Sequence, residues 1–204
     1  MTPTPTSSKS PTISRADSDA QIALRLARPA DIAALDALIR VSTHALQAPY
    51  YSPAQIDGAL GSVFAVDRQL IADGTYFVCE RDATLAGCGG WSRRKTLFGG
   101  DAGRDASEDT LLDPRCEPAR IRAFFVHPQW ARRGIGTRIL DACERAAAQA
   151  GFTSLELVAT LAGVPLYARG GFDAVEHFDI ALANGLAMPA VRMRKDITWQ
   201  NASG

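Results

Sequence analysis

One segment of the sequence constrains the fold more than any other: an apolar strand pattern that runs into a glycine turn and then a helix. Residues 119–126 are mainly apolar, and after Gly134-Ile135-Gly136 apolar residues recur every three or four positions until Gly151. A glycine turn at a helix start leaves backbone N–H groups and the positive end of the helix dipole facing an anion. The segment therefore predicts a phosphate-binding turn inside an α/β domain.

The residues around this turn limit which class of phosphate ligand could bind there. Gly134 and Gly136 have no Cβ, so a pyrophosphate could approach the main chain, and Arg132 and Arg133 add two cations. The Gly-x-x-x-x-Gly-Lys pattern of a P-loop is absent. The dinucleotide fingerprint also fails, because the residue three positions after Gly136 is Ile139 and not glycine. On these residues alone, a plain tight turn with solvated arginines remains the alternative.

The composition indicates one globular domain with an N-terminal tail. The chain has 204 residues, of which 47% are hydrophobic and 22% charged. Residues 1–20 are rich in Pro, Ser and Thr and offer little to a core, so we expect a flexible tail before a single domain over 21–204. The 22 basic and 22 acidic residues cancel, which disfavours nucleic acid as a partner.

The cysteines and the apolar runs bear on metal sites and location. Neither a Cys-x-x-Cys spacing nor a nearby histidine pair accompanies the four cysteines, so we expect buried reduced thiols and no metal. No apolar run approaches the ~18 residues of a membrane span, and a secretion signal is missing. The sequence thus favours a cytoplasmic protein without a membrane partner.

Local periodicity predicts a mixed order of strands and helices. Strands are expected at 22–26, 75–80, 83–91, 119–126, 154–159, 172–180 and 191–197. Helices are expected at 31–45, 54–60, 67–72, 135–150 and 164–169. The polar stretch 92–118 reads as an unusually long loop, of the kind that covers a site or moves.

Two motifs in this order resemble the GCN5-related N-acetyltransferase (GNAT) family. The first is Phe125-Val126-His127-Pro128 followed by Ala131-Arg132-Arg133-Gly134-Ile135-Gly136, and the second is Pro165-Leu166-Tyr167-Ala168-Arg169-Gly170-Gly171-Phe172. The resemblance spans residues 22–197. It implies an α/β fold with a twisted, mixed but mostly antiparallel sheet of about six or seven strands and about four flanking helices.

The resemblance also implies a co-substrate and its site. Acetyl-CoA would bind with its pyrophosphate on the main chain of the glycine turn and its pantetheine amides along the edge of the preceding strand. The Val126 N–H would polarise the acetyl carbonyl, and an amine would attack directly. Tyr167 matches the family's general acid, which protonates the CoA thiolate. The residues predicted to bind the co-substrate are Phe125, Val126, Ala131, Arg132, Arg133, Gly134, Ile135, Gly136 and Thr137.

Two positions depart from the family pattern. Ala131 stands where the signature often has Gln or Arg, and Thr160, Ala162 and Gly163 stand where many relatives place an asparagine that holds the co-substrate. Arg132 could compensate for the first change. These departures keep a non-catalytic acyl-CoA-binding module open as an alternative.

The base and the acceptor have weaker signals. Glu117, just before the strand, is the candidate general base, with a solvated loop carboxylate as the alternative, and His127 is similarly ambiguous. We expect the acceptor pocket near His44, Tyr50, Tyr51 or residues 93–95.

The leading function is acetyl transfer to a small-molecule amine. A protein N-terminal or lysine acetyltransferase, a binding module and another nucleotide-phosphate site are the alternatives. The terminal hairpin and Trp199 are candidates for the contact surface of a homodimer.

Overall fold

The computed structural model describes residues 22–82, 84–100 and 110–197. The N-terminal tail predicted over residues 1–20 and Trp199 lie outside the described residues. The strands are β1 (Ile22–Leu26), β2 (Tyr76–Arg81), β3 (Thr84–Ser92), β4 (Ala119–Val126), β5 (Ser154–Thr160), β6 (Asp173–Ala181) and β7 (Ala187–Asp196). The helices are η1 (Pro29–Asp31), α2 (Ile32–Leu46), α3 (Pro53–Ala59), α4 (Arg68–Ala72), η3 (Pro128–Trp130), α5 (Ile135–Gln149) and α6 (Val164–Arg169).

Side-chain caps mark the starts of α3 and α4. Ser52 caps α3 by accepting a hydrogen bond from the Gln55 N–H, and the Gln55 side chain accepts from the Ser52 N–H in return. Asp67 caps α4 through the Leu70 N–H. Helix α5 starts at Gly134, whose φ of 82° places it in the left-handed region. The predicted helices therefore form close to their expected bounds.

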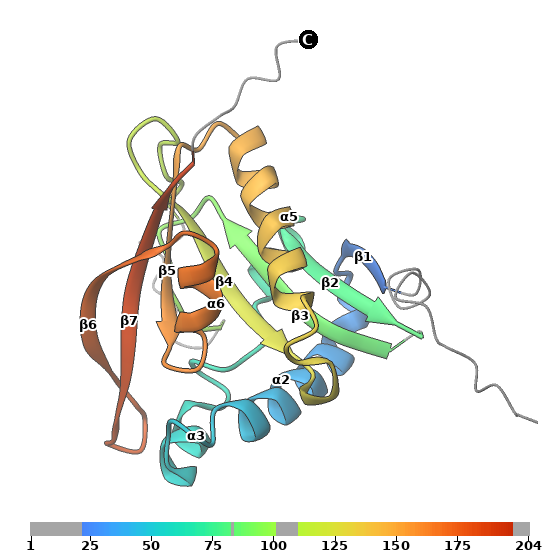
Figure 1. The fold of residues 1–204 in the computed structure, drawn as a ribbon, viewed down its shortest axis with the longest axis vertical. Helices are drawn as coiled ribbons and strands as arrows, with labels where there is room; N and C mark the ends of the chain where they lie inside the picture. The colour runs from blue at the N-terminus through green and yellow to red at the C-terminus, as the bar shows by residue number, and fades with distance from the viewer. Residues whose placement is uncertain (1–21, 83, 101–109, 198–204) are drawn as a thin grey trace, which may run out of the picture.

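The seven described strands form one sheet in the order β1-β2-β3-β4-β5-β7-β6 (Figure 1). All neighbours are antiparallel except β4 and β5, which run parallel. One face packs against α2, α3 and α4, and the other against α5 and α6. Side chains alternate between the faces as strand geometry requires, with Val78 on the first and Cys79 on the second. This mostly antiparallel α/β sheet confirms the predicted fold class.

Strands β4 and β5 separate after two residue pairs. In the described chain they pair only at Ala119 with Leu155 and Arg120 with Glu156. Further along β4 lies a bulge at Ala123, whose φ is 56°, a conformation that non-glycine residues rarely adopt. The buried Tyr76 hydroxyl donates to the Ala123 carbonyl at 3.2 Å and supports the bulge. The edge of β4 that faces β5 is thus unpaired from Ile121 to Val126.

The start of one strand and the burial of one cysteine differ from the sequence prediction. Strand β7 begins at Ala187 and not at 191, although Pro189 lies within it. Pro189 pairs with β6 just before the pairing of β7 with β5 begins at Ala190. Its carbonyl, which points to the same side as its nitrogen, accepts from the Tyr51 hydroxyl, so the missing N–H lies on the side where β5 does not pair. Cys79, Cys88 and Cys143 are buried as expected, but Cys116 is exposed because it lies in the turn before β4.

Candidate active site

The glycine turn has the geometry of an anion site. The first hydrogen bond of α5 runs from the Arg138 N–H to the Gly134 carbonyl at 2.9 Å, so the helix leaves the N–H groups of Ile135, Gly136 and Thr137 unused. Arg132 also adopts a positive φ, of 64°, which bends the chain into the turn. An open pocket of about 380 Å³ lies in front of these groups.

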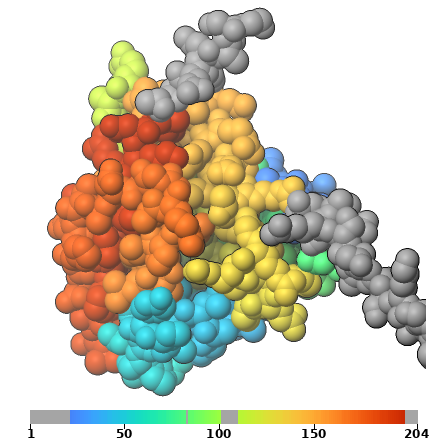
Figure 2. Space-filling model, in the orientation of Figure 1, coloured from blue at the N-terminus to red at the C-terminus, as the bar shows by residue number. Residues whose placement is uncertain are grey.

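This pocket, which we call the glycine-turn pocket, collects most of the residues predicted to bind the co-substrate. On the face seen in Figure 2, yellow residues of the turn lie beside orange residues of α6, with α2 and α3 below. The predicted residues that line it are Val126, Ala131, Arg132, Gly134, Ile135, Gly136 and Thr137. The residues that sequence reasoning missed are Leu46, Trp130, Ala162, Leu166 and Arg169.

Arg133 and Phe125 lie elsewhere. The Arg133 guanidinium stacks on Trp130 at 5.1 Å from the ring centre, while Arg81 stacks on the same ring at 4.3 Å. Arg133 lines a smaller hollow on the side of α5 that faces β1. The Phe125 side chain is buried and packs edge-on against Phe64. Neither side chain faces the glycine-turn pocket.

The end of β4 carries the amide predicted to polarise the acetyl carbonyl. The Val126 N–H donates to the Ser42 hydroxyl of α2 at 3.3 Å, a long hydrogen bond. Ser42 reaches it because α2 packs across β4. An acetyl carbonyl that binds the Val126 N–H would therefore have to share this hydrogen bond with the Ser42 oxygen or take its place.

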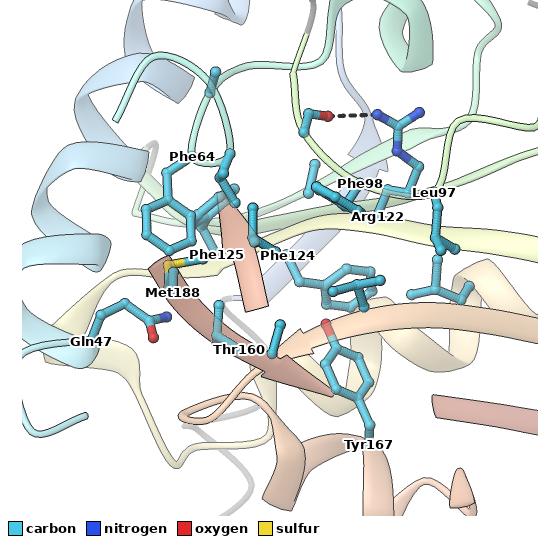
Figure 3. Close-up of a pocket in the computed structure, with 18 residues that line it drawn as sticks. Gln47, Phe64, Leu97, Phe98, Arg122, Phe124, Phe125, Thr160, Tyr167 and Met188 are labelled. Carbon is cyan, nitrogen blue, oxygen red and sulfur yellow. Dashed lines mark hydrogen bonds between the residues drawn. The ribbon is translucent and has the colours of Figure 1, made fainter. Parts of the chain in front are cut away.

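A second, more enclosed pocket lies between the separated strands on the other side of β4 (Figure 3). We call it the inner cavity, and its volume is about 80 Å³. Its lining residues are Gln47, Val63, Phe64, Ala65, Leu97, Phe98, Gly99, Ile121, Arg122, Ala123, Phe124, Phe125, Val158, Thr160, Tyr167, Ile180, Met188 and Ala190. These residues come from strands β4 to β7, from α6 and from three loops that are far apart in the sequence. No short motif could therefore have predicted the set.

Tyr167 stands at the wall of the inner cavity. Its ring packs edge-on between Phe124 and Phe172 at 5.9 and 6.0 Å, and Figure 3 shows its hydroxyl directed toward the cavity. Burial raises the pKa of Tyr167 above its usual value, so the hydroxyl stays protonated at neutral pH. Fixed orientation and a retained proton are what a proton donor needs.

Glu117 is not brought to this site. Its carboxylate accepts a hydrogen bond from the Asp113 N–H at 2.8 Å and closes the turn that precedes β4. It thus lies at the opposite end of β4 from Val126, and it lines neither the glycine-turn pocket nor the inner cavity. His127 accepts from the Gln129 N–H and caps η3. The structure gives no support to either residue as the general base.

The residues expected near an acceptor also have other roles. The Tyr51 hydroxyl accepts from the Leu161 N–H and donates to the Pro189 carbonyl, both at 2.8 Å, and so ties the end of β5 to β7. Arg94 pairs with Asp73 at 2.8 Å, and His44 and Tyr50 are exposed. The same long loop does contribute, but through Leu97, Phe98 and Gly99. The loop residues 101–109 lie outside the described chain.

The described residues also bear on metal binding and on membrane crossing. Among them, no group of three or more His, Cys, Asp or Glu side chains gathers as a metal set. None of their helices combines the length and apolar character that a membrane crossing requires.

Comparisons with known proteins agree with this geometry. Residues 72–174, about half of the chain, match the family model described as the acetyltransferase (GNAT) domain. No curated protein matches the sequence.

Solved structures share the fold at low sequence identity. A GCN5-related N-acetyltransferase from Rhodopseudomonas palustris is 22% identical with a TM-score of 0.64, covering 87% of this chain and 96% of that one. The PaiA N-acetyltransferase of Thermoplasma acidophilum, solved with coenzyme A, is 15% identical with a TM-score of 0.57, covering 86% and 98%. The ribosomal-protein-S18-alanine N-acetyltransferase of Escherichia coli is 14% identical with a TM-score of 0.53, covering 90% and 98%. Because the family model matches from the end of α4 to the start of β6, the chain belongs to the GNAT family of N-acetyltransferases.

Proposed function

We propose that the protein transfers an acetyl group from acetyl-CoA directly to the primary amine of a small molecule. The observation that carries this proposal is the unpaired edge of β4 between two pockets. Val126 lines the glycine-turn pocket, and its neighbours Phe124 and Phe125 line the inner cavity. A thioester arm laid along this edge would bring its reactive end to the point where the pockets meet.

The glycine turn fits the charged end of acetyl-CoA. A Cβ at Gly136 would come within 3.1 Å of Leu166 Cδ2, so a side chain there would crowd the wall of the glycine-turn pocket. The unused N–H groups of Ile135, Gly136 and Thr137 would hold the pyrophosphate. Arg132 and Arg169 line the same pocket and would add positive charge. Acetyl-CoA supplies the activated acetyl group, and the chain's residues bind and orient it.

Thr160 is one of the residues that stand where many relatives place an asparagine, so the pantetheine arm needs another anchor. Its hydroxyl accepts from the Gly163 N–H at 3.2 Å, and its side chain lines the inner cavity. Pairing with the backbone of β4 is therefore the main anchor that we propose for the pantetheine.

Tyr167 completes the transfer. The amine nitrogen forms a bond to the acetyl carbon, the carbon–sulfur bond breaks, and the Tyr167 hydroxyl gives its proton to the thiolate. The amide product releases its own excess proton, which restores the tyrosine. Burial disfavours the thiolate as it disfavours the charged form of Tyr167, so the site favours a thiol that leaves protonated.

The enclosure of the inner cavity favours a small acceptor over a peptide. Loops before α4 and before β4 cover it, together with β6 and β7, and its volume of about 80 Å³ suits a small molecule. A folded protein could offer only the tip of a side chain or of its N-terminus.

Calorimetric titration with acetyl-CoA, CoA and ADP, followed by thiol release with a panel of amines, tests the proposal. We expect acetyl-CoA and CoA to bind in the micromolar range, and ADP more weakly, because ADP has no arm to pair with β4. Amine-dependent release of CoA would support the transferase. Tight binding without release for any amine would indicate the binding module instead, and equal binding of ADP would indicate another nucleotide site.

A further inference from the structure

We infer that the acceptor is a small primary amine with an uncharged apolar body and no carboxylate, and that Gln47 receives its N–H. This inference rests on the proposed function, because it describes the substrate of the same site. It comes from the walls of the inner cavity, which carry no motif in the sequence.

The walls of the inner cavity are apolar with few exceptions. Of the described residues that line it, only Gln47, Arg122, Thr160 and Tyr167 have polar side chains. The Thr160 hydroxyl already accepts a hydrogen bond from the Gly163 N–H. Most of the lining side chains are therefore aromatic or aliphatic, while main-chain groups and the polar side chains contribute comparable surface, so an uncharged acceptor body can pack against the apolar side chains.

The cation in the wall is already neutralised. The Arg122 guanidinium lies 2.8 Å from the Asp67 carboxylate and donates to the Gly99 carbonyl at 2.5 Å. The two side chains are 2% and 0% exposed, so they form a buried pair of zero net charge. A substrate carboxylate would enter as a second anion without a matching cation, and burying an unmatched charge is costly. Amino acids are therefore disfavoured as acceptors.

Gln47 lies where the two pockets meet. Three neighbouring pairs of residues divide between the pockets, with Leu46, Val126 and Leu166 in the glycine-turn pocket and Gln47, Phe125 and Tyr167 in the inner cavity. The acetyl group of the bound co-substrate would reach this junction. An amine held by Gln47 would therefore lie next to the carbon that it attacks.

The Gln47 carboxamide has an acceptor to offer. Its backbone is fixed, because the carbonyl accepts from the N–H groups of Tyr50 and Tyr51 at 2.9 and 3.1 Å. Its Oε1 is buried and has no hydrogen-bond partner among the described residues. Figure 3 shows the side chain directed toward Thr160 and Met188. A buried acceptor without a partner is costly, and a bound amine N–H would satisfy it.

Acceptor pairs that differ by one carboxylate test the inference. Isoamylamine and leucine share the same branched body, and tyramine and tyrosine form a second pair. We expect kcat/KM for each amine to exceed that for its amino acid by about 100-fold, as expected for burying an unmatched charge. An amino acid or a peptide acetylated as well as the matched amine would overturn the inference and leave the proposed function intact. No CoA release with any amine, amino acid or peptide would overturn both.

Gln47→Leu tests the polar contact. We expect KM for isoamylamine to rise about tenfold, with acetyl-CoA affinity unchanged, because one buried hydrogen bond is lost. Gln149→Leu makes the same change at the exposed end of α5 and should leave KM unaltered. Gln47→Met, which keeps the length of the side chain, serves if the leucine variant is unstable. An unchanged KM in a folded Gln47 variant would overturn the role of Gln47.

Discussion

The two ends of the β4–β5 pair differ in structure and, we propose, in function. At the first end Ala119 and Arg120 pair with Leu155 and Glu156, and the Arg120 and Glu156 side chains form an ion pair that is largely buried. At the other end the strands have separated, and the unpaired edge of β4 lies between the glycine-turn pocket and the inner cavity.

The contrast shows how one strand can provide both support and an open site. Backbone groups that are paired at the first end contribute to the sheet, while at the second they are available to a ligand. The bulge at Ala123 lies at the change from one to the other, and Tyr76 fixes it from the core. Substitutions at the paired end should therefore change stability, and those at the open end should change binding or turnover.

Glu156→Gln should have the largest effect, at the paired end. It removes the ion-pair partner of the largely buried Arg120 guanidinium, which then has only the weaker attraction of Glu117, so we expect the free energy of unfolding to fall by about 3 kcal/mol. Urea denaturation measures this change. Glu176→Gln is the control, because Glu176 is half exposed and its pair with Arg192 should contribute less than about 1 kcal/mol. Equal losses in the two variants would contradict the prediction, as would a lower kcat for folded Glu156→Gln.

Gly136→Asp should have the next largest effect, at the open end. The new carboxylate would occupy the approach to the unused N–H groups and repel a pyrophosphate, so we expect the Kd for acetyl-CoA to rise about 100-fold. Calorimetry measures the Kd, and Gly136→Ala separates the effect of size from that of charge. If Gly136→Asp binds acetyl-CoA normally, the pyrophosphate does not lie at this turn.

Tyr167→Phe should have the smallest effect of the three and should act on turnover alone. Removing the proton donor is expected to lower kcat by about tenfold or more while the Kd for acetyl-CoA stays the same. Tyr50→Phe removes an exposed hydroxyl and serves as the control. Unchanged kcat at saturating substrates would exclude Tyr167 as the donor and weaken the distinction between the two ends of the strand pair.

The fold was largely predictable from the sequence because its elements have local signals. Periodicity located the strands and helices to within a few residues, with the start of β7 as the main error. The fold class followed from the two motifs and is confirmed. Of the candidate site, the glycine turn and Tyr167 were predicted, whereas Glu117 was assigned by its position before a strand and lies in the turn before β4, outside both pockets.

The sequence by itself determined the glycine turn, the helix behind it and the tyrosine helix, because each depends on residues close together in the chain. Only the tertiary structure decided what the inner cavity accepts. Gln47, Arg122 and Asp67 have no shared motif. The Arg122–Asp67 pair, and the burial of a Gln47 oxygen that has no partner within the described chain, arise only where distant segments pack. Burial makes such contacts chemically important, because removing water raises the cost of an unmatched charge or hydrogen-bond acceptor.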